Sequence, residues 1–202
     1  MQDSYLTISK NSEGLYKEKG SKFIALAFPV RSEEQVKEKL EEVKKTYYDA
    51  RHHCYAYILG ADGAQYRAND DGEPNHSAGD PILGQIRSKE LTNTLVVVVR
   101  YFGGTKLGVS GLINAYKVSA AEALEQNKVV EKLITKAVKF TFPYEEMNEV
   151  MKLVSDFELE IINQEFEMEC ILKAEVIVSK AEELTNKCQL LHDLGRVIQY
   201  EI

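Results

Sequence analysis

Apolar and polar residues alternate along the last third of the chain, as they do in strands that bury one face. Phe140 and Phe142, for example, are separated by Thr141, and similar alternation recurs further on. Ser179 and Glu182 form a capping box ahead of a helical stripe of apolar residues. The predicted strands are 138–142, 159–166, 168–178 and 197–202, and the predicted helices are 147–157 and 181–191. This β-α-β-β-α-β order is the ferredoxin-like arrangement.

The first two thirds of the chain show shorter apolar runs separated by turn signals. Residues 95–99 form a continuous run of Leu and Val, which is typical of a strand buried on both faces. Ser32 and Gln35 form a capping box for a helix that ends near Lys45, and Ser110 is placed to cap a second helix. The predicted strands are 23–30, 54–59, 65–67 and 95–99. We therefore expect an α+β domain of three to five strands and two main helices.

Charge and glycine content change near residue 130. Residues 1–130 carry 17 Lys or Arg and 17 Asp or Glu, whereas residues 131–202 carry 8 and 15 and so account for the net charge of −7. Nine of the twelve glycines lie between Gly60 and Gly111. These shifts predict two domains, at 1–130 and 135–202.

Composition excludes several classes of protein. No apolar run exceeds six residues, which is too short to span a bilayer, and the first residues do not resemble a secretory signal. The three cysteines are far apart and odd in number, so neither a disulfide framework nor a zinc finger is expected. We expect a cytoplasmic protein with no membrane partner.

A glycine-rich segment joins the buried strand 95–99 to the next predicted helix. Such a loop can point backbone N–H groups at an anion, and the helix N-terminus adds partial positive charge. The segment matches neither a Walker A loop nor a dinucleotide-binding fingerprint, and its glycines could equally serve tight turns. The candidate anion-binding or RNA-binding residues are Arg100, Tyr101, Phe102, Gly103, Gly104, Lys106, Gly108, Ser110 and Gly111.

A second candidate is a polar cluster around the loop at residues 70–81. Imidazoles and carboxylates at these positions could hold a divalent metal for a hydrolase, although the spacing is no known ligand pattern. The alternative is a rigid loop whose carboxylates cap backbone N–H groups. The cluster consists of His52, His53, Asp70, Asp71, Glu73, His76 and Ser77.

The local charge around the glycine-rich segment is positive. Residues 84–118 contain five Lys or Arg and one acid, Glu90, with Tyr101, Phe102 and Tyr116 interleaved. Basic and aromatic side chains together suit nucleic acid, by neutralising phosphates and stacking on bases, but a solvated face with core aromatics has the same composition. Cys54 lies near His52 in a predicted strand, where a buried structural thiol is expected.

The motifs together resemble those of the YigZ/Impact family. The matching residues are 50–57, 70–74, 77–83, 100–108, 111–112 and 115–116, in the order in which the family has them. The resemblance implies an N-terminal domain like the second domain of ribosomal protein S5. It also implies a C-terminal domain like a late domain of translation elongation factor G, and a link to translation.

Three functions stay open on the sequence alone. The first is a non-enzymatic, translation-associated regulator that binds RNA or the ribosome through the basic, glycine-rich site. The second is a regulator that docks a protein partner through the acidic C-terminal domain, and the third is a metal-dependent hydrolase that uses the polar cluster. The first function requires no catalytic residue, metal or cofactor, and no DNA partner is predicted.

Overall fold

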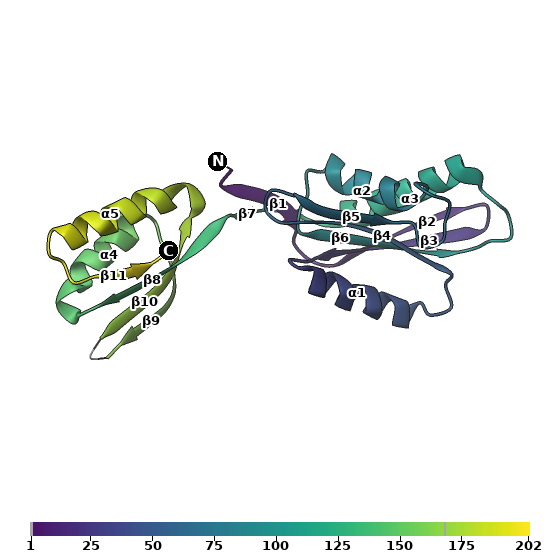
Figure 1. Ribbon diagram of the computed structural model, residues 1–202. Helices are drawn as coiled ribbons and strands as arrows, with labels where there is room; N and C mark the ends of the chain where they lie inside the picture. Colours follow the sequence, from purple (N-terminus) through teal and green to yellow (C-terminus); the bar gives the residue numbers. More distant parts are fainter. Residues whose placement is uncertain (1, 168) are drawn as a thin grey trace. The chain divides into compact units, whose positions relative to one another are not determined.

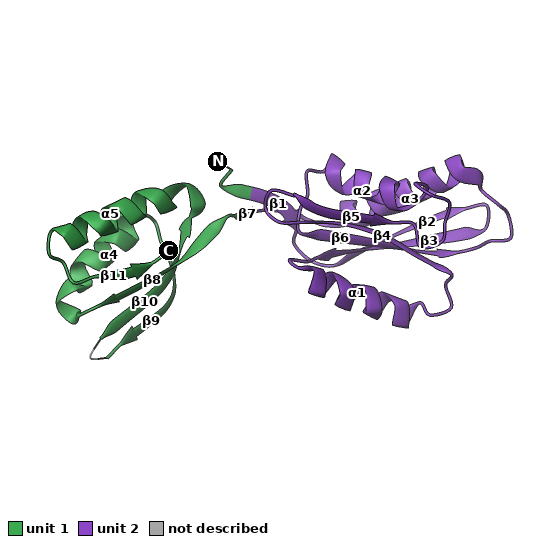
Figure 2. Cartoon of the chain, viewed as in Figure 1, with its two compact units in different colours: residues 1–4, 133–202 green, residues 5–132 purple. Residues whose placement is uncertain are grey.

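The computed structural model describes residues 2–167 and 169–202, and it divides the chain into two compact units (Figure 2). Residues 5–132 form the larger unit. The smaller unit combines residues 1–4 with residues 133–202, so the chain crosses between the units twice. A two-stranded sheet of β1 (Ser4–Ile8) and β7 (Val129–Leu133) includes both crossing points.

The larger unit is built on a five-stranded antiparallel sheet of order β2-β3-β6-β4-β5. Helix α1 covers one face, and α2 and α3 cover the other (Figure 1). The strands are β2 (Ser12–Glu18), β3 (Ser21–Pro29), β4 (His52–Leu59), β5 (Gln65–Asn69) and β6 (Thr94–Tyr101). The helices are α1 (Glu33–Thr46), α2 (Gly79–Ser88) and α3 (Gly108–Glu125).

Strand β6 is central because it packs on both faces, as its continuous apolar run predicts. Val96 and Val98 belong to the core beneath α2 and α3, while Leu95, Val97 and Val99 belong to the core beneath α1. All five side chains are fully buried. Because β6 is packed on both faces, it fixes the position at which the chain leaves the sheet after Tyr101.

The smaller unit is a four-stranded antiparallel sheet of order β11-β8-β10-β9, with α4 and α5 on one face (Figure 1). Its strands are β8 (Thr135–Phe142), β9 (Glu160–Phe166), β10 (Cys170–Ile177) and β11 (Gln199–Glu201). Its helices are α4 (Met147–Asp156) and α5 (Ala181–Asp193), each preceded by a short 3-10 turn, η1 (Tyr144–Glu146) and η2 (Val178–Lys180). The α+β class and the ferredoxin-like order are confirmed.

Three local predictions are wrong. The loop expected through Pro81 ends earlier, because α2 begins at Gly79. Helix α3 begins at Gly108, so Ser110 lies in its first turn and caps nothing. Ser179 does not cap α5 either; its backbone N–H and its hydroxyl both donate to the Asp3 carboxylate, at 3.2 and 2.6 Å.

Other local predictions are confirmed. The backbone N–H of Gln35 donates to the Ser32 hydroxyl at the start of α1, and β4 pairs with β5 through the turn at Gly60–Gly63. Met168, which belongs to a predicted strand, lies outside the described residues. Among the residues described, no helix combines the length and hydropathy needed to span a membrane.

Candidate functional site

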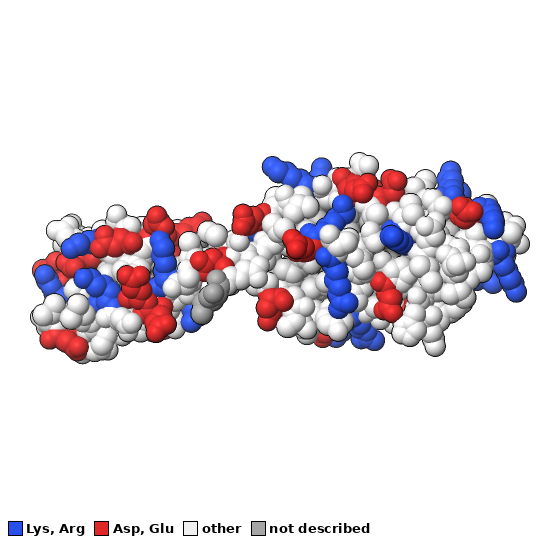
Figure 3. All heavy atoms as spheres, turned by 90° about the horizontal axis from the view of Figure 1, so that it is seen from above, with Lys and Arg blue, Asp and Glu red and all other residues white. Residues whose placement is uncertain are grey.

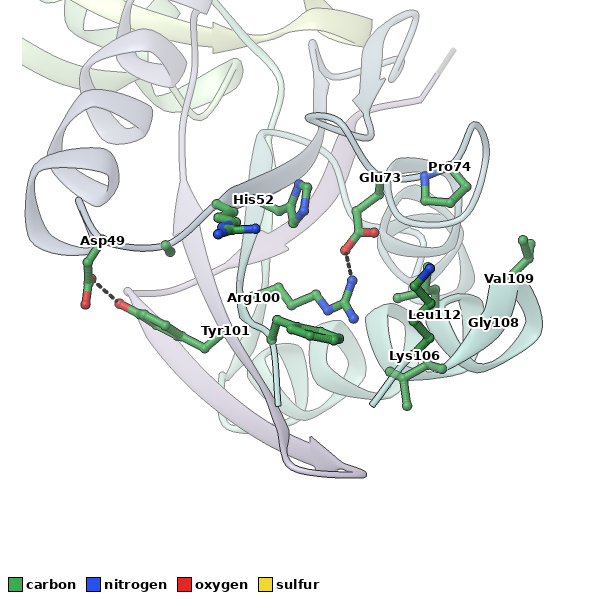
Figure 4. A pocket seen from close by; sticks show the side chains of 14 residues that line it. Asp49, His52, Glu73, Pro74, Arg100, Tyr101, Lys106, Gly108, Val109 and Leu112 are labelled. Atoms are coloured by element: carbon green, nitrogen blue, oxygen red, sulfur yellow. Dashed lines mark hydrogen bonds and ion pairs between the residues drawn. The ribbon is translucent and has the colours of Figure 1, made fainter. Parts of the chain in front are cut away.

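A pocket of about 870 Å³ opens at one end of the larger unit (Figure 4). Three segments line it: the entry to β4, the loop between β5 and α2, and the connection from β6 to α3. The two loops that the sequence singled out therefore share one cleft. The lining residues are Asp49, Ala50, Arg51, His52, Glu73, Pro74, Arg100, Tyr101, Phe102, Lys106, Leu107, Gly108, Val109 and Leu112.

Basic side chains gather at this end of the larger unit. The connection from β6 to α3 lies at the right in Figure 1, and Figure 3 shows Lys and Arg clustered at the same end. The visible face of the smaller unit mixes acidic and basic side chains. Of the five Lys and Arg in residues 84–118, however, only Arg100 and Lys106 line the pocket, while Arg87 lies over the Tyr66 ring and Lys89 pairs with Glu125.

Arg100 forms a buried ion pair within the pocket wall. Its Nη1 donates to Oε1 of Glu73 at 2.5 Å, and the two side chains are 8% and 4% exposed. The same Glu73 oxygen accepts a hydrogen bond from the Tyr116 hydroxyl at 2.9 Å. The guanidinium also lies 5.5 Å and 5.7 Å from the ring centroids of Phe23 and Phe102. Arg100 therefore lines the pocket with its charge already balanced.

The Nε atom of Arg100 is buried and has no hydrogen-bond partner among the described residues. An unsatisfied buried donor is costly, and such atoms concentrate where a structure serves a ligand or a special role. In Arg100 this unpaired N–H donor belongs to a side chain that lines the pocket.

The glycines of the connection have separate roles. The Gly103 N–H donates to the Ser21 hydroxyl at 3.1 Å, and a Cβ on Gly103 would stand 1.9 Å from the backbone of Gly20. Gly103 is thus required for close packing against the β2–β3 turn. Gly104 and Gly108 have φ values of +89° and +73°, and space is open around both. These two positions give the loop its left-handed bends.

Helix α3 begins at the pocket without a side-chain cap. Its N-cap residue, Leu107, provides no capping hydrogen bond, and Gly108 and Val109 line the pocket. The first N–H groups of a helix have no partner within the helix and carry partial positive charge. Lys106 and Arg51 are exposed beside them and form no ion pair in the described part of the chain.

Two aromatic side chains border the opening. Phe102 is 56% exposed, so its ring is open to solvent at the edge of the pocket. The Tyr101 hydroxyl donates to Oδ1 of Asp49 at 2.7 Å, and this hydrogen bond to a carboxylate raises the pKa of Tyr101 to about 12. An exposed ring next to unpaired cations is the combination that binds a base and its phosphate.

Most of the predicted polar cluster supports the loop. The Asp70 carboxylate accepts from the backbone N–H groups of His76, Ala78 and Gly79 at 2.8–3.0 Å, and so covers the start of α2. Burial opposes ionisation of Asp70, but the hydrogen bonds from Gly79, His76 and Ala78 outweigh it and lower the pKa. The capping interpretation of this loop is confirmed for Asp70.

The other cluster members are dispersed. Asp71 Oδ2 accepts from the His53 N–H at 2.7 Å, the Ser77 hydroxyl donates to the Pro74 carbonyl at 2.6 Å, and exposed His76 pairs with Asp80 at 2.6 Å. Only His52 and Glu73 of the cluster line the pocket. No group of three or more His, Cys, Asp or Glu in the described ranges is arranged to hold a metal ion.

His52, unlike His53, lines the pocket. Its Nδ1 lies 2.8 Å from the backbone carbonyl oxygen of Asp71, which fixes the ring beside the loop. Cys54, two residues on, is fully buried, as expected for a structural thiol. Burial raises the pKa of Cys54 to about 12, against a weaker lowering by the Tyr116 hydrogen bond, so the thiol stays protonated.

The structure brings five of the nine predicted anion-site residues into the pocket: Arg100, Tyr101, Phe102, Lys106 and Gly108. Gly103, Gly104, Ser110 and Gly111 shape the loop and the first turn of α3 without lining it. Sequence reasoning missed Arg51 and Asp49. Arg51 lies directly before the predicted cluster, and its charge next to two histidines is a signal that could have included it.

The family is established by comparison with known proteins. The family model of the Impact N-terminal domain matches residues 19–124, a range that includes every pocket-lining residue. The chain belongs to the YigZ/Impact family. The IMPACT family member YigZ of Escherichia coli is 32% identical over 171 residues, which cover 84% of this chain and 84% of YigZ.

Two further likenesses extend the comparison. The IMPACT family member YvyE of Bacillus subtilis is 38% identical over 144 residues, covering 71% of this chain and 66% of YvyE, just under two thirds of its length. A crystal structure of a protein described as hypothetical shares 29% identity, with a TM-score of 0.72, and covers 99% of this chain and 97% of its own. The family likeness thus extends over both units.

Proposed function

We propose that the chain is a translation-associated regulator that binds RNA, free or within the ribosome, through the pocket of the larger unit. The observation that supports this most directly is the arrangement at one pocket wall, where the uncapped start of α3 lies next to Lys106 and exposed Phe102. The link to translation rests on membership of the YigZ/Impact family and on what that resemblance implies.

Charge at the pocket favours a phosphate over a carboxylate-rich protein. The pocket is lined by three basic side chains and two carboxylates: Arg51, Arg100 and Lys106, and Asp49 and Glu73. Glu73 is already paired with Arg100. The helix N-terminus adds further positive potential. Arg51 and Lys106 are therefore the side chains available to neutralise phosphates, while Phe102 offers a surface on which a base can stack.

The proposal is tested by measuring the affinity of the protein for transfer RNA and ribosomal RNA at increasing salt. Affinity should fall steeply, because phosphate binding releases counterions. Lys106→Ala and Arg51→Ala should each weaken binding at low salt and reduce the slope of log affinity against log salt by about 1. Arg100→Ala is a poor test, because it leaves Glu73 buried without its partner.

Lys117→Ala is the matched control, since Lys117 is an exposed lysine on α3 that does not line the pocket. It should leave both affinity and slope nearly unchanged. Equal losses in Lys117→Ala and Lys106→Ala would assign the binding to diffuse charge and not to the pocket. Absence of any salt-sensitive RNA binding by the wild-type protein would refute the proposed function.

A protein partner is a second candidate function, supported by the smaller unit. The sheet face opposite α4 and α5 carries a hollow of about 430 Å³, where Ile162 is 60% exposed and Ile202 is 38% exposed. Lys173 and Glu175 border the hollow. Capture of partners from lysate by the full chain, compared with Ile162→Glu, tests this candidate: an unchanged set of captured proteins contradicts it.

A further inference from the structure

The hydrogen bond between His52 and Asp71 determines which ring nitrogen carries a proton. Nδ1 lies 2.8 Å from the Asp71 backbone oxygen, and a carbonyl oxygen can only accept a hydrogen bond. Nδ1 is therefore protonated, and the neutral ring keeps its lone pair on Nε2. A Cβ placed on Gly72 would meet Nδ1 and Cε1 of this ring at 3.6 Å, so the Nδ1 edge faces the 71–72 turn.

Nε2 of His52 is left as a hydrogen-bond acceptor in the pocket. Among the described residues no group donates a hydrogen bond to Nε2. The atom is also not fully buried, so a ligand can reach it. Figure 4 shows the ring on the wall formed by the entry to β4, beside the paired side chains of Glu73 and Arg100. The carboxylates of Asp49 and Glu73 can also accept, but they repel a phosphate, whereas a neutral imidazole does not.

The pocket thus presents a neutral acceptor beside groups that attract a phosphate. A ligand that fits this pattern carries an O–H donor close to a phosphodiester, with an attached base that can lie on exposed Phe102. The ribose 2′-hydroxyl of RNA is such a donor, and DNA lacks it. The volume of about 870 Å³ is within the range of pockets that hold ligands of nucleotide size.

We propose that Nε2 of His52 accepts a hydrogen bond from a ribose 2′-hydroxyl and so makes the pocket select RNA over DNA. This inference rests on the proposed function, in which the same pocket binds an RNA phosphate. It makes His52 a specificity-determining residue. The cations bind the phosphate of any nucleic acid, whereas His52 recognises the 2′-hydroxyl that only RNA carries.

The experiment compares three single-stranded oligonucleotides of equal length: oligouridylate, its 2′-deoxy form and its 2′-O-methyl form. The first two differ only in the 2′-hydroxyl, and the third keeps the oxygen but cannot donate. Binding is measured by fluorescence anisotropy at low salt and about pH 8, where free imidazole is neutral. The wild-type protein should bind oligouridylate roughly fivefold more tightly than the other two, which corresponds to one hydrogen bond of about 1 kcal/mol.

His52→Asn is the decisive variant. The asparagine amide nitrogen can take the place of Nδ1 and donate to the Asp71 carbonyl, but nothing replaces Nε2. The variant should bind all three oligonucleotides with the affinity that the wild type shows for the deoxy form. His192→Asn, at an exposed histidine of the smaller unit, should keep the fivefold preference.

The outcomes separate this inference from the proposed function. Salt-sensitive binding with equal affinity for the ribo and deoxy forms overturns the role of His52 and leaves phosphate binding in place. A preference that survives His52→Asn also overturns it. If none of the oligonucleotides and none of the natural RNAs binds, the proposed function fails as well.

Discussion

Nη1 of Arg100 lies 2.5 Å from Oε1 of Glu73, and the pair joins the strand β6 to the loop that precedes α2. The two residues are 27 positions apart, and both are almost fully buried. The pair therefore fixes the pocket wall in place and removes Arg100 from the cations that a ligand can use. Arg51 and Lys106 are left to provide the charge.

Removal of Arg100 should destabilise the fold far more than removal of Lys106. Arg100→Ala leaves a buried carboxylate without its partner, which costs about 3–5 kcal/mol, whereas an exposed lysine contributes within about 0.5 kcal/mol. Urea denaturation gives the free energy of unfolding for both variants. The double variant Arg100→Met/Glu73→Gln should lose clearly less stability than the sum of its single substitutions, because each single substitution leaves one buried charge without a partner and the double variant leaves none. Additive losses would contradict a coupled pair.

Two glycine substitutions should act in opposite directions. Gly103→Ala puts a Cβ 1.9 Å from the Gly20 backbone and should separate the β2–β3 turn from the connection to α3. Gly84→Ala lies in α2, where a Cβ meets nothing within 4 Å, and should stabilise the protein by about 0.5–1 kcal/mol. Thermal denaturation measures both effects. A Gly103→Ala variant as stable as the wild type would show that the turn can move away.

The lowered pKa of Asp70 should make the larger unit sensitive to acid. Because the folded pKa lies below the unfolded one, the unfolded chain binds the proton more readily, and stability rises with pH through this range. The contribution is complete above the ordinary carboxyl pKa of about 3.9 and is lost as pH falls through the lower folded value. Urea denaturation across this range should therefore show a weaker pH dependence for Asp70→Asn than for the wild type. Identical pH profiles would mean that the three backbone hydrogen bonds do not favour the ionised form.

The three thiols should resist modification in the native protein. Cys54, Cys170 and Cys188 are buried, and burial raises the pKa to about 12 for Cys54 and to about 11 for Cys188. Thiolate, the reactive form, is scarce at neutral pH under these conditions. Ellman's reagent should report almost no reaction until a denaturant is added, and then three thiols per chain. Rapid labelling without denaturant would contradict the buried positions.

The sequence predicted the fold more fully than the site. Periodicity identified β6 and the smaller unit, because a strand buried on both faces and a strictly alternating strand have distinct patterns. It missed α2, since Pro81 and the acidic residues before it resemble a loop; the Asp70 carboxylate, nine residues before Gly79, covers the start of that helix. Such a long-range cap has no local signature.

The sequence also could not predict which charged side chains form ion pairs in the folded protein. Arg100 and Lys106 are six residues apart in one basic segment, yet one is neutralised inside the wall and the other is exposed. Only the folded arrangement brings Glu73 to Arg100. His52 similarly required the position of the Asp71 carbonyl before its ring could be oriented.

The contact of Asp3 with Ser179 has a consequence for the order of assembly during synthesis. The ribosome makes residues 5–132 before most of the smaller unit exists, so the larger unit can fold first. The Asp3 carboxylate therefore stays solvated until Ser179, 176 positions later, has been synthesised. The smaller unit can thus close around the Asp3 side chain only after Ser179 has been made, and a chain truncated before Ser179 would hold Asp3 only through the pairing of β1 with β7 and the hydrogen bond from the Ile134 N–H to the Asp3 carbonyl, at 2.7 Å.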